Sequence, residues 1–372
     1  MSVILATAGY DHKIRFWEAP SGICSRALVF PDSQVNRLEI TRDKQFLAAA
    51  GNPLIRIFEV NGASTGPVMA CEGHSASVTG VGFQGDGRWM YSCSEDGTVK
   101  VWDLRGPGAQ RSFLCGAPCN DVVLPADGGD RTLVSADAGG RVKVWDLGTG
   151  RAIADVCPER EAAEAALPPV TGDHPEGTGG KGKGAATKAV GEGGASRPAV
   201  APTPAQGPCS PAPLQAVDVS EDGGLLCCLS SRGEVHAYDL SATGIPERTH
   251  SFRAHHSYAT ACRISPDGRH LVTCGSDRTA RLWSTSGATD RGPDGSGNGS
   301  GGDGSIWKCD GVLDGHGRWV WDAAFSADSS YLVTASSDYS SRLWNLRTGE
   351  VVRQYSGHAG PVTCVALNDS ST

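Results

Sequence analysis

A short motif recurs seven times along the 372 residues, and this repetition constrains the fold more than any other feature. Each copy ends a β-prone run with an aromatic residue, which is usually followed by an acidic one. Successive aromatic residues lie 41, 44, 43, 93, 45 and 61 residues apart, so the spacing is nearly constant except for two stretched intervals. Such a period indicates one small supersecondary unit that is repeated and stacked. The seven aromatic residues are Trp17, Phe58, Trp102, Trp145, Tyr238, Trp283 and Trp344.

Residues 74–104 show the internal order of one unit. The runs VTGVGF, WMYSCS and VKVWDL are separated by the turn sequences GDGR and EDGT. Short β-prone runs bounded by Gly and Asp predict antiparallel strands joined by tight turns. Two further units follow the same order, and in all three a His precedes a turn Asp by 22 residues. The three pairs are His74 and Asp96, His255 and Asp277, and His316 and Asp338.

This pattern resembles the WD-repeat family, whose units fold as four-stranded blades of a β-propeller. The resemblance covers nearly the whole chain outside two insertions. It implies an all-β fold in which residues 1–372 form a single seven-bladed propeller. The physical argument agrees, because one such unit cannot bury both of its faces. Stacked blades bury them, and a closed ring leaves only short, protected strand edges.

The two ends of the sequence each carry part of a unit. Residues 3–8 begin without a Gly-His pair or an inner strand before them, and no further strand follows the run at 361–367. We therefore expect the C-terminal strand to pair into the N-terminal blade and to close the ring non-covalently. In that case His358 pairs with Asp11, beside Trp17.

Two stretches do not belong to the repeat. Residues 157–212 contain ten Gly, many Ala and Pro and almost no large apolar side chain, and residues 286–305 contain eight Gly. Such segments cannot bury enough apolar surface to offset the entropy of ordering. We expect both to be disordered, the first between blades four and five and the second within blade six.

Composition excludes several classes of function. The net charge of −8 argues against a general nucleic-acid binder, which needs a surplus of Lys and Arg. The N-terminal residues do not form a secretory signal, and no apolar run approaches the roughly 18 residues of a membrane span. Most of the 13 Cys lie in apolar runs, which is typical of buried thiols in a reducing compartment. Because the closest Cys lack zinc-site spacing, we expect no metal.

Two motifs contain the residue types of catalytic or cofactor-binding sites. The recurring sets of His, hydroxyl, Asp and Trp use the residue types of a Ser-His-Asp triad, but a catalytic site is made once and these sets occur in several blades. Family resemblance implies a structural hydrogen-bond network instead. The Gly-rich residues 177–184 approach a phosphate-binding loop, but they lack its Ser or Thr and its flanking strand and helix. We therefore expect no cofactor and no small-molecule substrate.

Blades two, four and five depart from this set. Asn52 replaces the turn Asp in blade two, Asp137 is displaced by two residues in blade four, and Arg232 occupies the Asp position in blade five. We expect apolar packing to contribute more to the stability of these blades.

Trp319 and Trp321 distinguish blade seven from the other units. Side chains two residues apart on a strand point to the same side, and these two lie where the innermost strand begins. The corresponding positions elsewhere favour small or aliphatic residues. The pair is typical of a binding hot spot, but it is equally compatible with gap-filling between blades.

Several runs narrow the resemblance further: VILATAGYDH near the N-terminus, DSQVN at 32–36, GRWMY at 87–91, VTASSD at 333–338 and ALNDS at 366–370. These runs resemble the WD-repeat subunit family of TOR kinase complexes, known as lethal with SEC13 protein 8 or G-protein β-subunit-like. The resemblance implies a non-enzymatic subunit that docks on the catalytic lobe of TOR kinase, stabilises the active kinase and supports growth and nutrient signalling with other complex subunits. It implies a cytoplasmic location, with peripheral attachment to endomembranes through the complex.

The resemblance also implies the residues that contact the kinase: Gln34, Ser77, Trp319 and Trp321. A different WD-repeat scaffold, such as a substrate receptor of a ubiquitin ligase, and a propeller enzyme with a catalytic channel remain as alternatives. The sequence shows no unique acid/base cluster that favours the enzyme.

Overall fold

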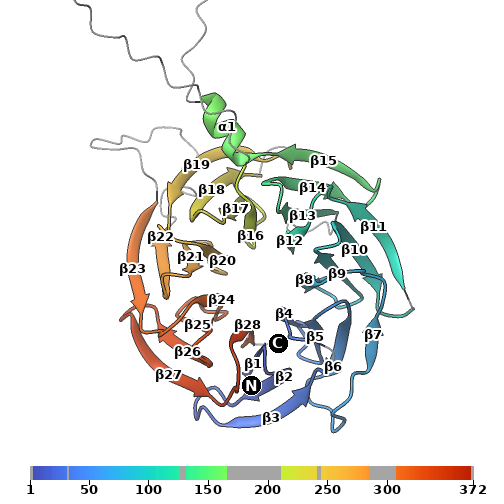
Figure 1. The fold of residues 1–372 in the computed structure, drawn as a ribbon, viewed down its shortest axis with the longest axis vertical. Helices are drawn as coiled ribbons and strands as arrows, with labels where there is room; N and C mark the ends of the chain where they lie inside the picture. Colours follow the sequence, from blue (N-terminus) through green and yellow to red (C-terminus); the bar gives the residue numbers. More distant parts are fainter. Residues whose placement is uncertain are drawn as a thin grey trace, which may run out of the picture.

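A computed structural model describes residues 3–31, 33–106, 108–125, 131–165, 211–240, 244–284 and 307–369. These residues form 28 strands and one helix. The strands make seven four-stranded antiparallel sheets arranged as blades around one axis (Figure 1). The predicted all-β, seven-bladed propeller is thereby confirmed.

Each blade has four strands, which follow one another from the axis outward. Blade one consists of β28 (Val362–Asn368), β1 (Ile4–Gly9), β2 (Lys13–Trp17) and β3 (Cys24–Val29). Blades two to four consist of β4 (Arg37–Ile40), β5 (Phe46–Ala50), β6 (Ile55–Glu59) and β7 (Met69–Cys71); β8 (Val78–Phe83), β9 (Trp89–Ser94), β10 (Thr98–Asp103) and β11 (Ala109–Leu114); and β12 (Cys119–Val123), β13 (Thr132–Asp137), β14 (Val142–Asp146) and β15 (Arg151–Val156). Blades five to seven consist of β16 (Leu214–Val219), β17 (Leu225–Ser230), β18 (Glu234–Asp239) and β19 (Glu247–Arg253); β20 (Ala259–Ile264), β21 (His270–Gly275), β22 (Thr279–Ser284) and β23 (Lys308–Asp314); and β24 (Val320–Phe325), β25 (Tyr331–Ser336), β26 (Ser340–Asn345) and β27 (Glu350–Ser356).

The ring is closed by the pairing of β28 with β1. The two strands are antiparallel, from Ile4 opposite Asn368 to Gly9 opposite Val362. The innermost strand of blade one therefore comes from the C-terminal end of the chain and its other three strands come from the N-terminal end. The predicted closure is confirmed, and Figure 1 shows both ends of the chain in this blade.

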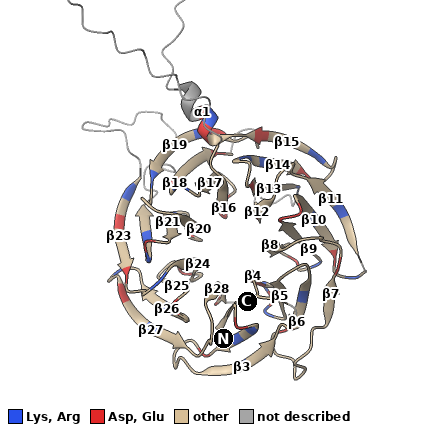
Figure 2. Ribbon diagram, viewed as in Figure 1, with Lys and Arg blue, Asp and Glu red and all other residues tan. Residues whose placement is uncertain are grey.

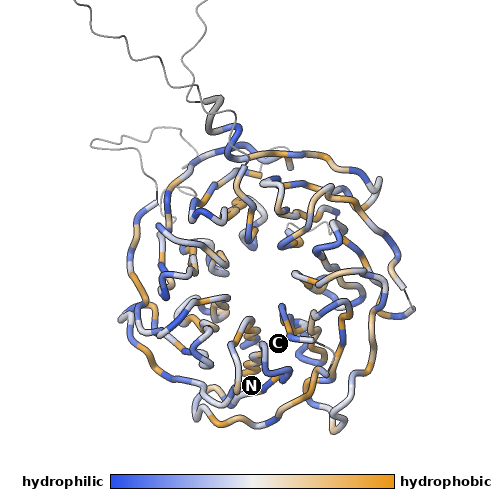
Figure 3. Tube along the Cα trace, in the orientation of Figure 1, coloured by the Kyte–Doolittle hydropathy of each residue, from blue (hydrophilic) through white to orange (hydrophobic). Residues whose placement is uncertain are grey.

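The hydrophobic core is distributed between neighbouring blades. One cluster, for example, packs Leu28 and Phe30 of blade one against Leu38, Leu47 and Phe58 of blade two, all at most 1% exposed. Apolar positions recur in every blade in Figure 3, as expected for units that bury their faces against each other. Basic and acidic positions are scattered around the ring in Figure 2 and do not gather on one blade.

The two faces of the ring carry different turns. We call the upper face the one at which the inner strands begin, and the lower face the one at which they end. Turns between the second and third strands of each blade also lie on the upper face. Gly233 forms such a turn with φ +85°, and a Cβ there would lie 2.3 Å from the carbonyl oxygen of His255 in the next blade. This close approach between blades requires glycine.

The expectation for 157–212 is wrong at the start of this insertion. Pro158–Ala165 form helix α1, which follows β15 directly. The backbone N–H of Ala212, at the other end of the insertion, donates to Glu159 Oε2 at 2.9 Å. Polar contacts with blade five thus order a helix that composition alone did not predict. Residues 166–210 and the whole of 286–305 lie outside the described residues, although the insertions fall between β15 and β16 and between β22 and β23, as expected.

Within the described ranges, no helix has the length and apolar character needed to cross a lipid bilayer.

Candidate protein-binding surface

Four blades contain the polar network that the sequence suggests. In blade three, Nδ1 of His74 lies 2.8 Å from Asp96 Oδ2, and Nε2 of the same ring lies 2.8 Å from Ser92 Oγ. Nε1 of Trp102 donates to that hydroxyl at 2.8 Å. The same contacts join His255, Thr273, Asp277 and Trp283; His316, Thr334, Asp338 and Trp344; and His358, Thr7, Asp11 and Trp17.

The protonation states follow from the directions of these bonds. Because the Trp102 indole N–H already donates to Ser92 Oγ, the hydroxyl proton is free to point at Nε2 of His74. The ring proton then resides on Nδ1 and is donated to Asp96. Burial lowers the pKa of His74, which keeps the ring neutral. Burial alone would raise the pKa of Asp96, but hydrogen bonds from Thr98, Ser75 and His74 together lower it to about 2.

The other three blades replace this network in different ways. In blade four, Trp145 Nε1 still donates to Ser135 Oγ at 2.9 Å, and the Cys115 thiol takes the place of the imidazole, 3.9 Å from the hydroxyl. In blade two, the Ser33 hydroxyl accepts from the backbone N–H of Asn52 at 2.8 Å.

Blade five obtains polar support from the insertion. Tyr238, which replaces the Trp, donates its hydroxyl to Glu161 of α1 at 3.1 Å. Arg232, at the position of the turn Asp, lies 3.4 Å from Glu159 of the same helix. Helix α1 therefore supplies the carboxylates that the blade itself lacks, in addition to the apolar packing that we expected.

A second polar pattern links the inner strands around the upper mouth of the channel. The inner strand of each blade begins at, or in blade two shortly after, a buried small or apolar residue, such as Val78 in blade three, and we number the inner-strand repeat from it. In five blades, the side chain of the second residue of this repeat donates to a backbone carbonyl oxygen at the start of the next inner-strand repeat, at 2.5–2.9 Å. These side chains belong to Asn36, Thr79, Asn120, Thr260 and Thr363.

Trp321 occupies the same position in blade seven and, like Gln215 in blade five, makes no such bridge to any described residue. Its indole N–H instead donates to Ser337 Oγ of its own blade, at 2.5 Å, and its ring is half-buried at the mouth of the channel. Blade seven therefore lacks this hydrogen bond to the next inner strand and has an aromatic surface at the same position. This observation favours binding over gap-filling.

Trp319 extends this aromatic surface outward. Its side chain is 41% exposed, and its ring lies 5.4 Å from that of Trp321 and 5.9 Å from that of Tyr258, with which it stacks. Tyr258 belongs to blade six, where it occupies the position that Trp319 has in blade seven. It was missed in the sequence, although an alignment of the units places it there.

The structure brings three of the four expected contact residues to one cavity. Gln34, Ser77 and Trp321 line a cavity of about 320 Å³ at the upper mouth of the channel. Three of the expected residues occupy equivalent positions in blades two, three and seven. Each stands immediately before the first residue of the inner-strand repeat, and they are Gln34, Ser77 and Trp319. Tyr10, which is 52% exposed, also lines this cavity and was not singled out from the sequence.

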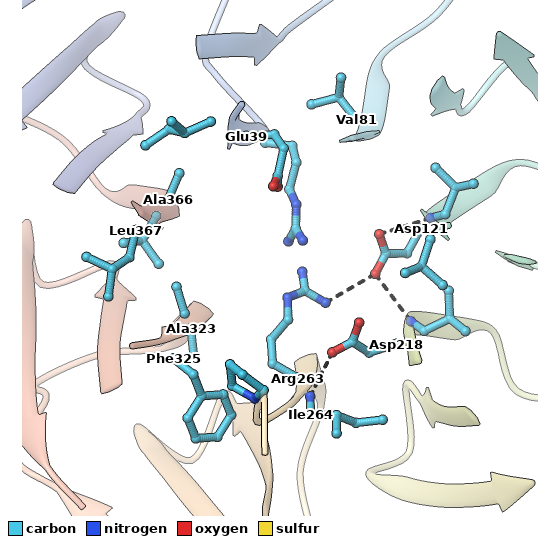
Figure 4. Close-up of a pocket in the computed structure, with 18 of the residues that line it drawn as sticks. Glu39, Val81, Asp121, Asp218, Arg263, Ile264, Ala323, Phe325, Ala366 and Leu367 are labelled. Atoms are coloured by element: carbon cyan, nitrogen blue, oxygen red, sulfur yellow. Dashed lines mark hydrogen bonds and ion pairs between the residues drawn. The ribbon is translucent and has the colours of Figure 1, made fainter. Parts of the chain in front are cut away.

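A chain of ion pairs divides the channel below this mouth. Arg37 lies 3.1 Å from Asp322, which lies 3.3 Å from Arg263, which in turn lies 3.5 Å from Asp121. A second cavity of about 280 Å³ lies on the other side of these ion pairs. Glu39 and Asp218 contribute carboxylates to its lining (Figure 4).

The channel carboxylates also tie neighbouring blades together. Asp121 accepts from the backbone N–H of Val217, and Asp218 from that of Ile264 (Figure 4). Burial raises the pKa of Asp121 to about 6 and those of Asp218 and Glu39 to about 7. This acid/base cluster was not recognisable in the sequence, because its members come from different blades. Because Asp121 and Asp218 accept hydrogen bonds from the inner strand of the next blade, both have a structural role.

Metal coordination has no evident site in the described part of the chain, where no three His, Cys, Asp or Glu side chains converge suitably. Exposed aromatic rings beside a polar cavity can bind another protein, since large amphipathic side chains dominate such interfaces.

Comparisons with known proteins agree with this architecture. The family model described as "WD domain, G-beta repeat" matches residues 65–103, 246–284 and 307–345. The target of rapamycin complex subunit LST8 of Saccharomyces cerevisiae is 39% identical over 373 aligned residues, which cover 99% of this chain and 100% of the yeast protein. This chain belongs to the LST8 family. Two other relatives also match over nearly their full length. The target of rapamycin complex subunit wat1 of Schizosaccharomyces pombe is 39% identical over 99% of this chain and 96% of its own length. The target of rapamycin complex subunit LST8 of Mus musculus is 35% identical over 99% of this chain and 95% of its own length. The resemblance inferred from the sequence runs is confirmed.

Proposed function

We propose that this protein is a non-enzymatic subunit of a target of rapamycin complex, which docks on the catalytic lobe of the kinase through the upper face of its ring. The observation that carries the proposal is Trp321, which replaces an inter-blade bridge with an aromatic surface beside Trp319. The naming of full-length LST8 relatives as complex subunits supports it.

The contact in this proposal is made by Trp319, Trp321, Gln34 and Ser77. The two indole rings and Tyr258 supply apolar area, and Gln34 and Ser77 supply polar groups at the mouth of the channel. The rigid ring holds these side chains in place before binding, which reduces the entropy lost on association. Binding in this way stabilises the active kinase and supports growth and nutrient signalling. The protein works in the cytoplasm, and at endomembranes only as part of the complex.

The test is affinity purification of the tagged full-length protein, followed by mass spectrometry and a kinase assay on the recovered complex. We expect the wild type to recover TOR kinase, and W319A/W321A to lose it. Each ring of a hot spot contributes about 2 kcal/mol or more, so each single variant should weaken binding roughly 30-fold. The matched control is Y331A, which removes an aromatic ring that is 36% exposed at the start of β25, on the lower face.

Circular dichroism and thermal unfolding of the purified variants establish that the ring is intact. Retention of the kinase by a folded W319A/W321A variant contradicts the assignment of the site. Recovery of ubiquitin-ligase adaptors without any kinase contradicts the proposed function and favours the alternative scaffold.

A further inference from the structure

A groove on the lower face, between blades three and four, combines three guanidinium groups with an indole ring. It has a volume of about 540 Å³, and its lining includes Arg88, Trp89, Arg105 and Arg111. The guanidinium group of Arg42 lies beside it, 3.6 Å from the position that a Cβ on Gly85 would occupy. With Asp86 and Asp103 also in the lining, the groove keeps a net positive charge in a chain whose net charge is −8.

Comparison of the seven blades shows that this combination belongs to blade three. Three positions can be compared in each blade. Two follow from the strands: the residue before the second strand, and the outer-strand partner of the residue that precedes the recurring aromatic. The other is defined by sequence alone, as the third residue after that aromatic. Arg occupies all three only in blade three, as Arg88, Arg105 and Arg111. The corresponding residues are Val3, Pro20 and Arg26 in blade one; Gln45, Asn61 and Met69 in blade two; Arg131, Gly148 and Ala154 in blade four; Gly224, Ser241 and His250 in blade five; Arg269, Ser286 and Gly311 in blade six; and Ser330, Arg347 and Arg353 in blade seven.

The three guanidinium groups differ in how they are held. Arg111 donates to the carbonyl oxygens of Leu147 and Gly148 in blade four, so it is fixed across the groove. Arg105 forms a two-pronged pair with Asp103, with bonds of 3.0 and 2.8 Å. Hydrogen bonds from Arg105 lower the pKa of Asp103 to about 2, so this carboxylate stays ionised.

Arg88 is available for a ligand. Its side chain is exposed, and among the described residues its guanidinium group has no hydrogen bond or ion pair. Trp89, next to it, is half-buried and adds an aromatic surface to the groove. Asp86 is the remaining carboxylate of the lining and opposes this charge, so the groove suits a ligand whose acidic groups reach the Arg side.

We propose that this groove, which we call the Arg groove, binds an acidic peptide segment of a partner protein. Carboxylates of the segment pair with Arg88 and with the N–H groups of Arg105 that Asp103 does not occupy, and an apolar side chain packs on Trp89. Guanidinium groups bind carboxylates through paired hydrogen bonds, which gives orientation as well as affinity. Since the groove lies on the face opposite Trp319 and Trp321, it can be occupied while the upper face is engaged. This inference does not depend on the proposed function.

The test uses fluorescence anisotropy with the full-length protein and a fluorescein-labelled twelve-residue peptide, in which Glu residues flank a single Leu. A second peptide has Gln in place of every Glu. We expect the Glu peptide to bind and the Gln peptide to bind at least tenfold more weakly. Affinity for the Glu peptide should fall severalfold between about 50 and 200 mM NaCl, because salt screens exposed charges.

The decisive variant is R88E/R105E, which should weaken binding of the Glu peptide at least tenfold. Its matched control is R347E: Arg347 is the third residue after Trp344, as Arg105 is after Trp102, but its blade has Ser330 in place of Arg88. This control should bind within twofold of the wild type. Unchanged thermal unfolding shows that each variant is folded.

Three outcomes overturn the proposal. The first is an absence of binding by the wild type, and the second is equal loss of binding in R347E and R88E/R105E. The third is binding of a phosphoserine version of the peptide without binding of the Glu version, which would assign the groove to phosphorylated segments instead.

Discussion

The blade networks and the central channel both bury carboxylates, but they surround them differently. Asp96, Asp277 and Asp338 each receive hydrogen bonds from a His, a hydroxyl and at least one backbone N–H group, and Asp11 receives them from His358 and two backbone N–H groups. In the channel, two arginines serve four carboxylates, and Glu39 relies on the charge of Arg37. The pKa is lowered in the blades and raised in the channel. Two environments of one ring therefore shift the pKa of the same chemical group in opposite directions: deeper burial raises it in the channel, and hydrogen-bond donors outweigh a shallower burial in the blades.

The largest effect that distinguishes the two regions is acid unfolding. The pKa values of Asp11, Asp96, Asp277 and Asp338 are lower in the folded than in the unfolded chain. Their stabilisation is complete above about pH 4 and is lost as the pH falls towards 2, by about 1 kcal/mol for each network after solvent screening.

The raised channel pKa values act oppositely at higher pH. Because the folded chain holds these protons more tightly, stability decreases as the pH rises from about 4 to 7. Denaturant titrations at several pH values should therefore show a maximum near pH 4. A stability that is constant from pH 3 to 7 contradicts both assignments.

Next in size is the loss of a network carboxylate. D338A removes the acceptor for His316, Ser340 and the backbone N–H of Gly317, and leaves these donors unpaired. We expect the free energy of unfolding to fall by about 3 kcal/mol. Urea unfolding measures it, with D328A as the control, because Asp328 lies in an exposed turn of the same blade. Equal effects of the two variants would contradict a special role for the network.

A smaller effect is expected from the same kind of change in the channel. D322N removes the charge between Arg37 and Arg263 but keeps an acceptor oxygen, and Asp121 remains beside Arg263. We expect a loss of about 1–2 kcal/mol by urea unfolding at pH 7. A loss as large as that of D338A would show that the channel pairs are as critical as the blade networks.

The smallest effect should have the opposite sign. E39Q removes a carboxylate that burial makes costly to ionise, so it should stabilise the ring by about 1 kcal/mol at pH 8 and hardly at all at pH 5. The control is E59Q, since Glu59 is exposed on the same blade and should change little at either pH. Destabilisation by E39Q at pH 8 would contradict the inference that the channel holds more carboxylates than its arginines can stabilise.

The fold and its closure could be predicted because the evidence for them is local and repeated. Each unit carries its own turn sequences and recurring aromatic, and the partial units at the two ends complement each other. The network partners were predictable for the same reason, since His74 and Asp96 have a fixed spacing that recurs in other blades.

The features that escaped prediction depend on contacts between units. Arg37, Asp121, Arg263 and Asp322 are single charges on separate strands, and only ring geometry brings them together. Helix α1 is stabilised by contacts of Glu159 and Glu161 with residues some 70 positions further along the chain. Trp319 and Trp321 were noticed in the sequence, but the missing bridge in blade seven became visible only when the inner strands were compared in space.

The pairing of β28 with β1 has a consequence for the order of events during synthesis. Thr7 and His358, which share a hydrogen bond, are 351 positions apart. At roughly 5–20 residues per second, β1 leaves the ribosome about 20–70 seconds before its inner neighbour exists. During that interval the edge of β1 is unpaired, and unpaired edges recruit other strands. The nascent chain therefore needs protection at its N-terminal blade until β28 arrives, and completion of the ring is set by translation time.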